Sequence, residues 1–205
     1  MNQEKKTNIT VLLQAGRLPL DIMAAARLLA EKHSLGVYLT TLQNLRLTDV
    51  PTSAEDEIKA QLLALGAELK APGKFPIPPV CVGLEHCSFA LIDTEDFSRR
   101  ILDRFAGRSH TKGKIKIAVA ACTMCCSGVK TSDIGIMATR NGYEVFVGGK
   151  GGANPRVGRR ISRRATESEV MDILVDLIEY HDRKTEHKQR IHKLLEDPEF
   201  PFQEV

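Results

Sequence analysis

Apolar residues in the first third of the chain follow first a strand-like and then a helix-like period. Residues 9–16 (ITVLLQAG) form a short apolar run that predicts a strand, and apolar side chains then recur at helical spacing across 19–33. Residues 36–47 carry β-forming side chains with partial alternation, which predicts one or two strands. A second helix is expected to begin at Ser53 and to stop at Gly66. This order predicts a small α/β unit.

A proline-rich segment interrupts this pattern. Residues 71–80 (APGKFPIPPV) hold four of the nine prolines in the chain. Proline fixes φ and removes a backbone donor, so this segment is expected to be an irregular connector. We therefore predict two domains, residues 1–71 and residues 72–205.

The pattern after the connector again mixes strands and helices. A helix is predicted between Thr94 and Gly107, a strand over 114–121, and a hairpin with an Asn-Gly turn over 133–149. A capping box, Thr-Glu-Ser-Glu, starts at Thr166 and predicts a further helix. The charged tail behind this helix is expected to form one more helix followed by a loose end, and the histidines within the last 25 residues are expected to be solvated.

Composition narrows the classes of function. The chain has 42% hydrophobic and 27% charged residues, no tryptophan and a net charge of +3, which is typical of a globular protein. This charge is too small to predict nucleic-acid binding, and no apolar run approaches the roughly 20 residues needed to span a bilayer. The polar N-terminus does not have the pattern of a signal peptide. We therefore expect a cytoplasmic protein without a nucleic-acid or membrane partner.

The five cysteines are unevenly distributed, with three in the stretch VAACTMCCSG. In a reducing compartment this indicates metal ligation or redox chemistry rather than a disulfide frame. Four of them form the pattern Cys81-x5-Cys87-x34-Cys122-x3-Cys126. Four thiolates suit an iron–sulfur cubane or a tetrahedral zinc ion. The x2 spacing from Cys122 to Cys125 fits zinc but the x5 spacing fits it poorly, so the pattern favours the cubane. Burial as small apolar side chains is the remaining interpretation.

These motifs resemble the sulfite and nitrite reductases that contain sirohaem and a [4Fe-4S] cluster. The resemblance rests on the two cysteine pairs, on the Lys-x-Lys strand that enters Cys122, and on the segments LTTLQNLRL, DIGIM and GYEVFVGGKGGANPRVG in the family's order. It covers residues 9–196. Family enzymes carry two related halves, in one chain or in two subunits, and this chain resembles a single cluster-bearing half of the small assimilatory type. The implied fold class is α+β, with a ferredoxin-like half-domain followed by an α/β sirohaem/[4Fe-4S]-binding domain with C-terminal helices.

The resemblance also implies roles for the cysteines. Cys126 would bridge to the sirohaem iron through its sulfur. Cys125 is left as a spare thiol, or it replaces Cys126 as the ligand if the loop register differs. The residues between the last two ligands depart from the family's common pattern, which is expected to change the cluster potential. The implied cubane ligands are Cys81, Cys87, Cys122 and Cys126.

Two lysines precede the second cysteine pair. Lys114 and Lys116 lie two apart on the predicted strand and so share one face, which Ala118 and Ala120 continue with small side chains. A flat macrocycle could approach this face, with two ammonium groups directed at an oxyanion. The resemblance assigns this lysine pair a catalytic role. The alternative is that both lysines are solvated on an edge strand.

A glycine-rich basic segment is the other candidate site. Residues 148–164 (GGKGGANPRVGRRISRR) hold five glycines, one lysine and five arginines. Arginine pairs well with carboxylates, and sirohaem carries several of them. A solvated basic loop and nucleic-acid binding are the alternatives, and the second is disfavoured because no aromatic side chains are interleaved. The candidates for binding the cofactor are Lys150, Arg156, Arg159 and Arg160.

The function expected from the resemblance is the six-electron reduction of sulfite or nitrite by a cubane coupled through Cys126 to sirohaem. The sequence leaves the choice of oxyanion open. No flavin or nicotinamide motif is present, so a ferredoxin-like electron donor is implied, and a homodimer or a related subunit would complete the site. One alternative is a non-catalytic electron-transfer or cofactor-handling member, because Leu42 stands where the family's Thr-Thr-Arg-Gln motif has a substrate-binding arginine. The other is a structural zinc protein.

Overall fold

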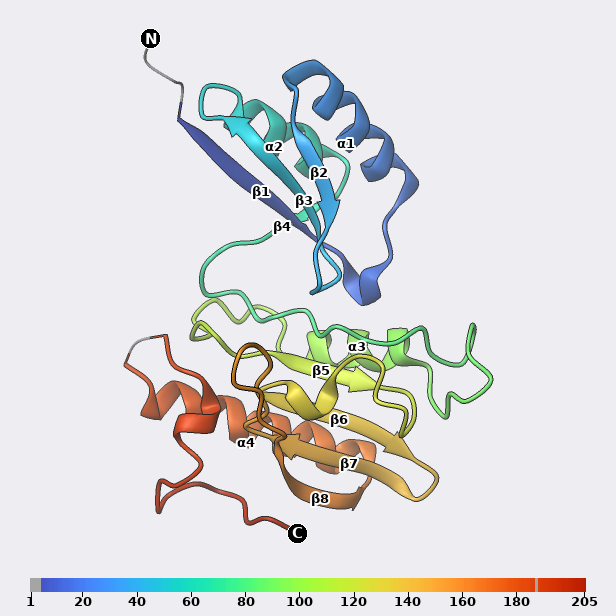
Figure 1. Ribbon diagram of the computed structural model, residues 1–205, viewed down its shortest axis with the longest axis vertical. Coiled ribbons are helices and arrows are strands. Elements are labelled where there is room, and N and C mark those ends of the chain that lie inside the picture. Colours follow the sequence, from blue (N-terminus) through green and yellow to red (C-terminus); the bar gives the residue numbers. More distant parts are fainter. Residues whose placement is uncertain (1–4, 187) are drawn as a thin grey trace. The chain divides into compact units, whose positions relative to one another are not determined.

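The computed structural model describes residues 5–186 and 188–205. The chain divides into two compact units, Met1–Ala71 and Pro72–Val205, and each unit has its own sheet and helices (Figure 1). Each unit also has its own buried apolar side chains. The proline-rich segment 71–80 contains neither a helix nor a strand, only isolated bridges. No helix in the described part of the chain is long and apolar enough to cross a membrane.

The first unit combines an antiparallel sheet with two helices. In chain order its elements are β1 (Lys6–Leu12), η1 (Gln14–Gly16), α1 (Leu20–His33), β2 (Gly36–Leu39), β3 (Leu45–Pro51), α2 (Glu55–Ala64) and β4 (Glu68–Leu69). The strand order is β2-β3-β1-β4. Val11 of β1 and Leu47 of β3 belong to one buried cluster with Ile58 and Leu62 of α2. The apolar faces of the strands and of the helix therefore pack together in a single core.

The second unit contains a mixed sheet. In chain order its elements are α3 (Thr94–Arg104), β5 (Ile117–Ala120), η2 (Val129–Thr131), β6 (Ile134–Thr139), β7 (Gly142–Val147), β8 (Arg159–Ala165), α4 (Glu167–Lys184) and η3 (Ile191–Lys193). The strand order is β5-β6-β7-β8, with β5 parallel to β6 and the other pairs antiparallel. Phe97 of α3 stacks on Tyr143 of β7 with ring centroids 5.1 Å apart. The predicted capping box of α4 is confirmed, with reciprocal hydrogen bonds between Thr166 and Glu169.

Two predicted strand boundaries are wrong. The first strand ends at Leu12, because Ala15 and Gly16 have left-handed φ values of 50° and 70° inside η1. The strand expected over 114–121 begins only at Ile117, because Lys114 has a left-handed φ of 73°. Residues preceding Ile117 therefore form a turn and an irregular approach to β5.

The prediction for the C-terminal tail is also wrong. After α4, the described residues form a short 3-10 turn, η3, instead of a further helix. The segment is held to the unit rather than loose, because the Phe200 ring packs edge-on against Tyr180 at 5.4 Å. Lys184 pairs with Asp197 at 3.0 Å and with Glu199 at 2.9 Å. The tail therefore contributes to the packed structure of the second unit.

Candidate functional site

The first cysteine loop is held along one edge of β5. The N–H of Val119 donates to the carbonyl of Pro79 at 3.1 Å, so the end of the proline-rich segment runs beside the strand. The thiol of Cys81 then accepts a hydrogen bond from the N–H of Ala121 at 3.1 Å. The Thr94 hydroxyl donates to the Cys81 carbonyl at 2.6 Å. Helix α3 and strand β5 together fix the position of this cysteine.

The second cysteine loop begins where the buried strand β5 ends. The Ser127 hydroxyl donates to the Val119 carbonyl at 2.6 Å and turns the loop back toward the strand. The N–H of Cys125 donates to the Cys122 carbonyl at 3.3 Å, and the N–H of Gly128 donates to the Cys125 carbonyl at 3.0 Å. These bonds form two successive tight turns, with Cys125 in the left-handed region at a φ of 58°.

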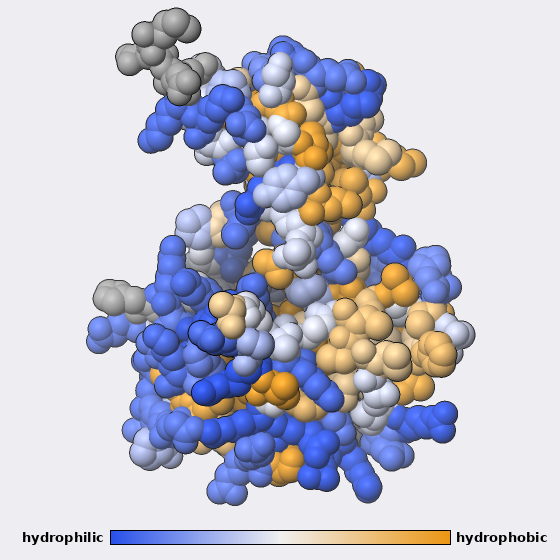
Figure 2. Space-filling model, in the orientation of Figure 1, coloured by the Kyte–Doolittle hydropathy of each residue, from blue (hydrophilic) through white to orange (hydrophobic). Residues whose placement is uncertain are grey.

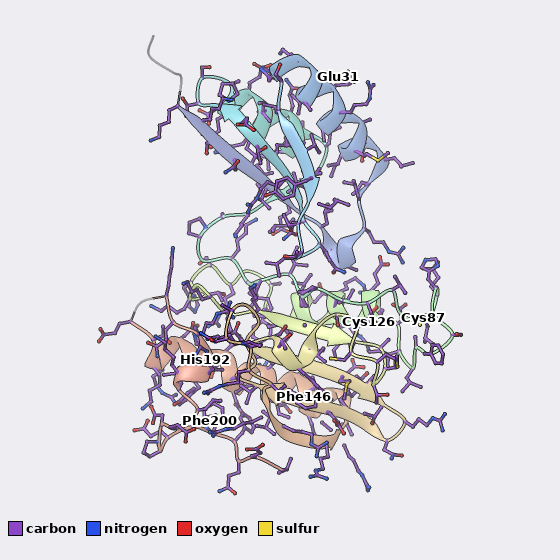
Figure 3. All side chains as sticks on the ribbon, viewed as in Figure 1. Glu31, Cys87, Cys126, Phe146, His192 and Phe200 are labelled. Atoms are coloured by element: carbon purple, nitrogen blue, oxygen red, sulfur yellow. The ribbon has the colours of Figure 1, made fainter. Side chains whose placement is uncertain are left out.

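The two adjacent cysteines, Cys125 and Cys126, lie in different environments. Cys125 is half-buried and packs against an apolar cluster that includes Val129 and Phe146. Cys126 is exposed. Figure 3 labels Cys126 and Cys87 on the same side of the second unit. The local fold therefore directs one thiol of the pair into the sheet packing and leaves the other accessible.

The structure brings the two cysteine loops together, but it does not gather the four sulfurs. The N–H of Leu91 donates to the Ala121 carbonyl at 2.9 Å, which adds a second link between the loops. Cys81, Cys87 and Cys122 are each partly accessible. Over residues 5–186 and 188–205, no three cysteine, histidine or carboxylate side chains are clustered as a metal site. The donor atoms are thiols on two adjacent loops, which is the type of ligand that an iron–sulfur cluster requires.

Exposed apolar side chains surround the cysteine loops. Large apolar residues on solvent-facing loops are unusual when they occur as a group. Figure 2 shows an apolar area on the second unit, on the side where Figure 3 labels Cys87 and Cys126. Such a rim can exclude water from a redox group that is bound beside it. The side chains are Val82, Leu84, Phe89, Leu91 and Met124, with exposed fractions between 39% and 69%.

The predicted geometry of the lysine pair is wrong. Lys114 lies in a left-handed turn, and Lys116 comes directly before β5, so the two do not share a strand face. The N–H of Lys116 donates to the Asp133 carboxylate at 3.1 Å instead of to a strand. Ala118 and Ala120 are fully buried in a cluster with Val129, Met137 and Phe146. Because the protein itself covers that face, a macrocycle cannot approach it.

The four basic residues predicted to bind the cofactor divide into two groups. Lys150 and Arg156 exchange two backbone hydrogen bonds, of 2.9 Å and 2.7 Å, at the base of a loop. Neither makes an ion pair with another described residue. Arg159 pairs with Glu196, and Arg160 pairs with Glu144 at 3.2 Å. The first group therefore presents unneutralised charge, whereas the second is already engaged by carboxylates of the chain.

Sequence reasoning missed Asp133 and the basic residues of the tail. Asp133 is fully buried and pairs with Arg190 at 2.9 Å. Burial lowers the pKa of His192, and the nearby charges of Lys150, Arg156, Arg190 and Lys193 lower it further. The expectation that the C-terminal histidines are solvated is wrong for His181, which is buried and contacts the Gln189 carbonyl at 2.8 Å. The sequence feature that could have identified Asp133 is its position, as an acidic residue, directly before an apolar strand.

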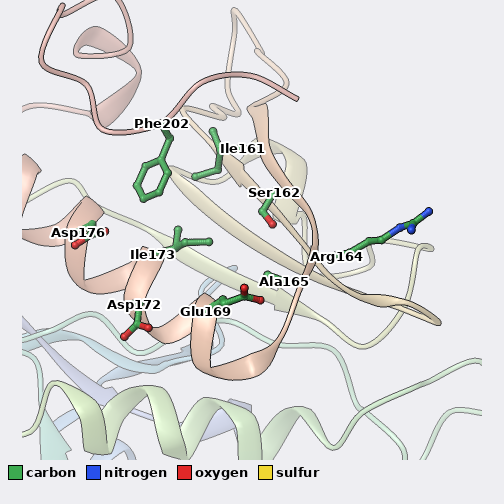
Figure 4. Close-up of a pocket in the computed structure, with 9 residues that line it drawn as sticks. All are labelled: Ile161, Ser162, Arg164, Ala165, Glu169, Asp172, Ile173, Asp176 and Phe202. Carbon is green, nitrogen blue, oxygen red and sulfur yellow. The ribbon is translucent and has the colours of Figure 1, made fainter.

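A separate pocket lies between β8 and the first half of α4, and Phe202 forms part of its wall (Figure 4). Its volume is about 480 Å³. Ile161 and Ile173 provide apolar lining, and Glu169, Asp172 and Asp176 add carboxylates. None of the cysteines, lysines or arginines predicted from the sequence lines it. This pocket is therefore distinct from the candidate site.

Models of two known protein families match the two units of the chain. The model of the nitrite and sulphite reductase 4Fe-4S domain matches residues 78–198, and the model of the nitrite/sulfite reductase ferredoxin-like half domain matches residues 1–65. These matches confirm the predicted family and the α+β fold.

The share of each relative's length that this chain covers differs widely. It is 27% identical over 183 residues to a nitrite reductase [NAD(P)H] of Emericella nidulans, covering 88% of this chain and 16% of that protein. It is 23% identical over 183 residues to an assimilatory-type sulfite reductase of Nitratidesulfovibrio vulgaris, covering 88% of this chain and 83% of that protein. The solved structure of the Mycobacterium tuberculosis NirA protein has the same fold, with a TM-score of 0.74 and 19% identity over 95% of this chain and 40% of that one.

Proposed function

Because this chain belongs to the nitrite and sulphite reductase family, we propose that it holds a [4Fe-4S] cluster on its two cysteine loops and sirohaem beside it. The observation that carries the proposal is the hydrogen bond from Ala121 N–H to the Cys81 thiol, because it places the first loop against the residue that precedes Cys122. N–H groups directed at a ligating sulfur stabilise the thiolate and tune the cluster potential. The proposed ligands are Cys81, Cys87, Cys122 and Cys126.

The contrast between the two adjacent cysteines supports Cys126 as the fourth ligand and as the bridge to the haem iron. Cys126 is exposed, whereas Cys125 contributes to the packing beneath η2. Using Cys125 as the ligand would take its side chain away from that apolar cluster. We therefore assign Cys125 a packing role.

The unneutralised cations favour Lys150 and Arg156 as the residues that hold the cofactor's carboxylates. Guanidinium and ammonium groups bind carboxylates through charge-assisted hydrogen bonds. Arg159 and Arg160 remain candidates, but each would have to exchange its carboxylate partner in the chain for one on the cofactor. Lys150 and Arg156 would make no such exchange.

The proposed activity is the six-electron reduction of sulfite or nitrite. When bound, the cluster and the sirohaem would supply the electrons and the iron chemistry for reduction of the oxyanion. Lys114 is exposed and Lys116 is partly exposed, and their ammonium groups would attract the oxyanion and donate protons to it. A ferredoxin-like protein would deliver the electrons. A second copy of the chain or a related subunit would supply further cations, since family enzymes carry two related halves and this chain resembles one of them.

A non-catalytic electron-transfer or cofactor-handling role is the second candidate. The observation that favours it is Leu42, an apolar residue at the tip of the β2–β3 hairpin where the family pattern has an arginine. Without that cation, an oxyanion would be bound more weakly, but the cysteine loops would be unchanged.

Anaerobic turnover separates the two candidates. The protein is loaded with iron, sulfide and sirohaem, reduced with a dithionite-generated donor dye, and supplied with sulfite or nitrite. Dye oxidation that depends on the oxyanion and is lost in Cys126→Ser supports the reductase. Reduction of the bound cluster by the dye without consumption of either oxyanion supports the second role. A protein that binds zinc and takes up no iron would overturn both.

A further inference from the structure

Asp133 connects three segments that carry basic residues. Its side-chain Oδ2 accepts hydrogen bonds from the N–H of Lys116 at 3.1 Å and from the Arg190 guanidinium at 2.9 Å. Its backbone carbonyl accepts from the N–H of Gly148 at 2.8 Å. A single fully buried residue therefore holds the approach to β5, the start of the basic loop (residues 148–158) and the tail that leads into η3.

Backbone contacts hold the basic loop between η2 and η3. The N–H of Gly158 donates to the Lys130 carbonyl at 2.8 Å. A Cβ at Gly149 would lie 2.5 Å from the carbonyl oxygens of Lys130 and Ser132. On the other side, a Cβ at Gly148 would lie 3.3 Å from the Cα of His192. Two glycines thus allow the loop to approach both turns closely.

The charges gathered by this arrangement are mostly of one sign. Arg190 is paired with Asp133, but Lys150, Arg156 and Lys193 have no carboxylate partner among the described residues. Their proximity is evident at His192, where they lower the pKa beyond the effect of burial. The Nδ1 atom of His192 and the Oδ1 atom of Asp133 are buried without hydrogen-bond partners in the described part of the chain. Cations held together in this way repel one another until an anion binds.

We propose that the C-terminal turn η3 forms part of the anion-binding surface, with Lys193 adding to Lys150 and Arg156, and that Asp133 is the positioning residue that holds this turn in place through Arg190. The ligand class is an anion with several carboxylate or similar oxyanion groups. This inference rests on the proposed function and adds to it the tail and the buried acid. Asp133 itself touches no ligand.

The direction in which one substitution changes the affinity for the anion distinguishes a positioning role from a purely electrostatic one. Asp133→Asn keeps an oxygen acceptor for the Lys116 N–H and removes one negative charge. If the charge of Asp133 acted only through space, removing it would strengthen anion binding. If Asp133 positions Arg190 and η3, the same change weakens binding, because the turn is no longer held against the basic loop.

The test measures binding of uroporphyrin, a polycarboxylate tetrapyrrole, to the full chain by fluorescence, and of inorganic sulfate by calorimetry. The variants are Asp133→Asn, Arg190→Gln, their combination, and Lys193→Gln. Arg163→Gln is the matched control. Arg163 is exposed on β8, so this substitution removes the same charge at a position outside the group of cations around η3. Arg190→Lys tests whether a cation without the guanidinium geometry suffices. Circular dichroism and thermal unfolding report folding.

The expected result is a loss of affinity of about tenfold for Asp133→Asn and for Arg190→Gln, with no further loss in the combination. Arg163→Gln is expected to bind as the wild type does. Unchanged or tighter binding by a folded Asp133→Asn would overturn the inference. If that variant does not fold, unchanged binding by Arg190→Gln overturns it equally.

The two ligands separate this inference from the proposed function. Binding of sulfate but not uroporphyrin, with the same dependence on Arg190 and Lys193, would support the anion-binding surface and rule out a tetrapyrrole as its ligand. If uroporphyrin binds and none of these variants changes its affinity, the proposed tetrapyrrole binding is supported but the inferred role of the tail is overturned. Binding of neither ligand would overturn the inference.

Discussion

The thiol of Cys81 and the N–H of Ala121 are joined by a hydrogen bond of 3.1 Å between residues 40 positions apart in the chain. This contact relates the two cysteine loops more directly than their sequence spacing does. Because Ala121 is the residue before Cys122, the first loop is positioned by the same strand that presents the second. A cluster bound at the loops would therefore be anchored to β5.

The first prediction concerns the adjacent cysteines. Cys126→Ala is expected to lose most of the iron and sulfide taken up on anaerobic reconstitution, because it removes a proposed ligand. Cys125→Ala is expected to retain both, with a modest loss of stability from its packing contacts. Iron and acid-labile sulfide assays on the two variants provide the measurement. The reverse outcome would place the ligand at Cys125.

The second prediction concerns the close approach at Gly149. Gly149→Ala would place a Cβ 2.5 Å from two carbonyl oxygens, so the backbone must shift. We expect a loss of about 1–3 kcal/mol in the free energy of unfolding, measured with denaturant. Gly151→Ala is the control, because no atom lies within 4 Å of a Cβ built there. Equal stability of the two variants would show that the loop is not confined as described.

The third prediction concerns the capping box of α4. Thr166→Ala should cost about 1 kcal/mol of unfolding free energy, whereas Ser168→Ala, which is exposed on the first turn, should cost much less. Hydrogen bonds from Thr166 lower the pKa of Glu169 below its ordinary value of 4.5. A carboxyl of this kind stabilises the fold above its unfolded pKa and loses that effect as the pH falls through the folded pKa.

The difference between wild type and Thr166→Ala should consequently shrink as the pH falls below about 4.5. Denaturant unfolding at a series of pH values measures this difference. A gap that stays constant across the acid range would mean that Glu169 does not couple to the cap.

The fourth prediction concerns Tyr180, whose ring is buried between α4 and the tail. Burial, reinforced by the Asp197 carboxylate, raises its pKa to about 12 from an ordinary value of 10. Because the folded state holds the proton more tightly, this residue should make stability fall as the pH rises from 10 toward 12. Phenolate absorbance should show a late titration step that Tyr180→Phe lacks. A Tyr180 that ionises near 10 would contradict the described packing of the tail.

Local sequence patterns predicted the elements that depend on neighbouring residues. The capping box at Thr166 needs only a partner three residues away, and the hairpin of β6 and β7 needs only a short turn. The cysteine pairs were found for the same reason, because each pair lies within one loop. The family and the α+β fold followed from the order of these motifs.

Contacts between distant residues could not be predicted in this way. Asp133 meets Lys116 and Arg190 across 17 and 57 positions, and nothing in the segment DIGIM marks such partners. Lys114 and Lys116 matched a strand pattern, but the left-handed turn at Lys114 and the bond from Lys116 to Asp133 delay the start of the strand to Ile117. The charged tail was expected to form a helix and a loose end, whereas its apolar residues Ile191 and Leu194 are buried.

The most direct test of the central claim is the content of iron and extractable tetrapyrrole, with the absorption spectrum, of protein purified without oxygen. We predict about four to five irons per chain and a macrocycle band, as expected from one cubane and one haem. A brown protein with about four irons that takes up no added sirohaem would restrict the function to electron transfer. A colourless protein that contains zinc and cannot be reconstituted with iron would contradict the account.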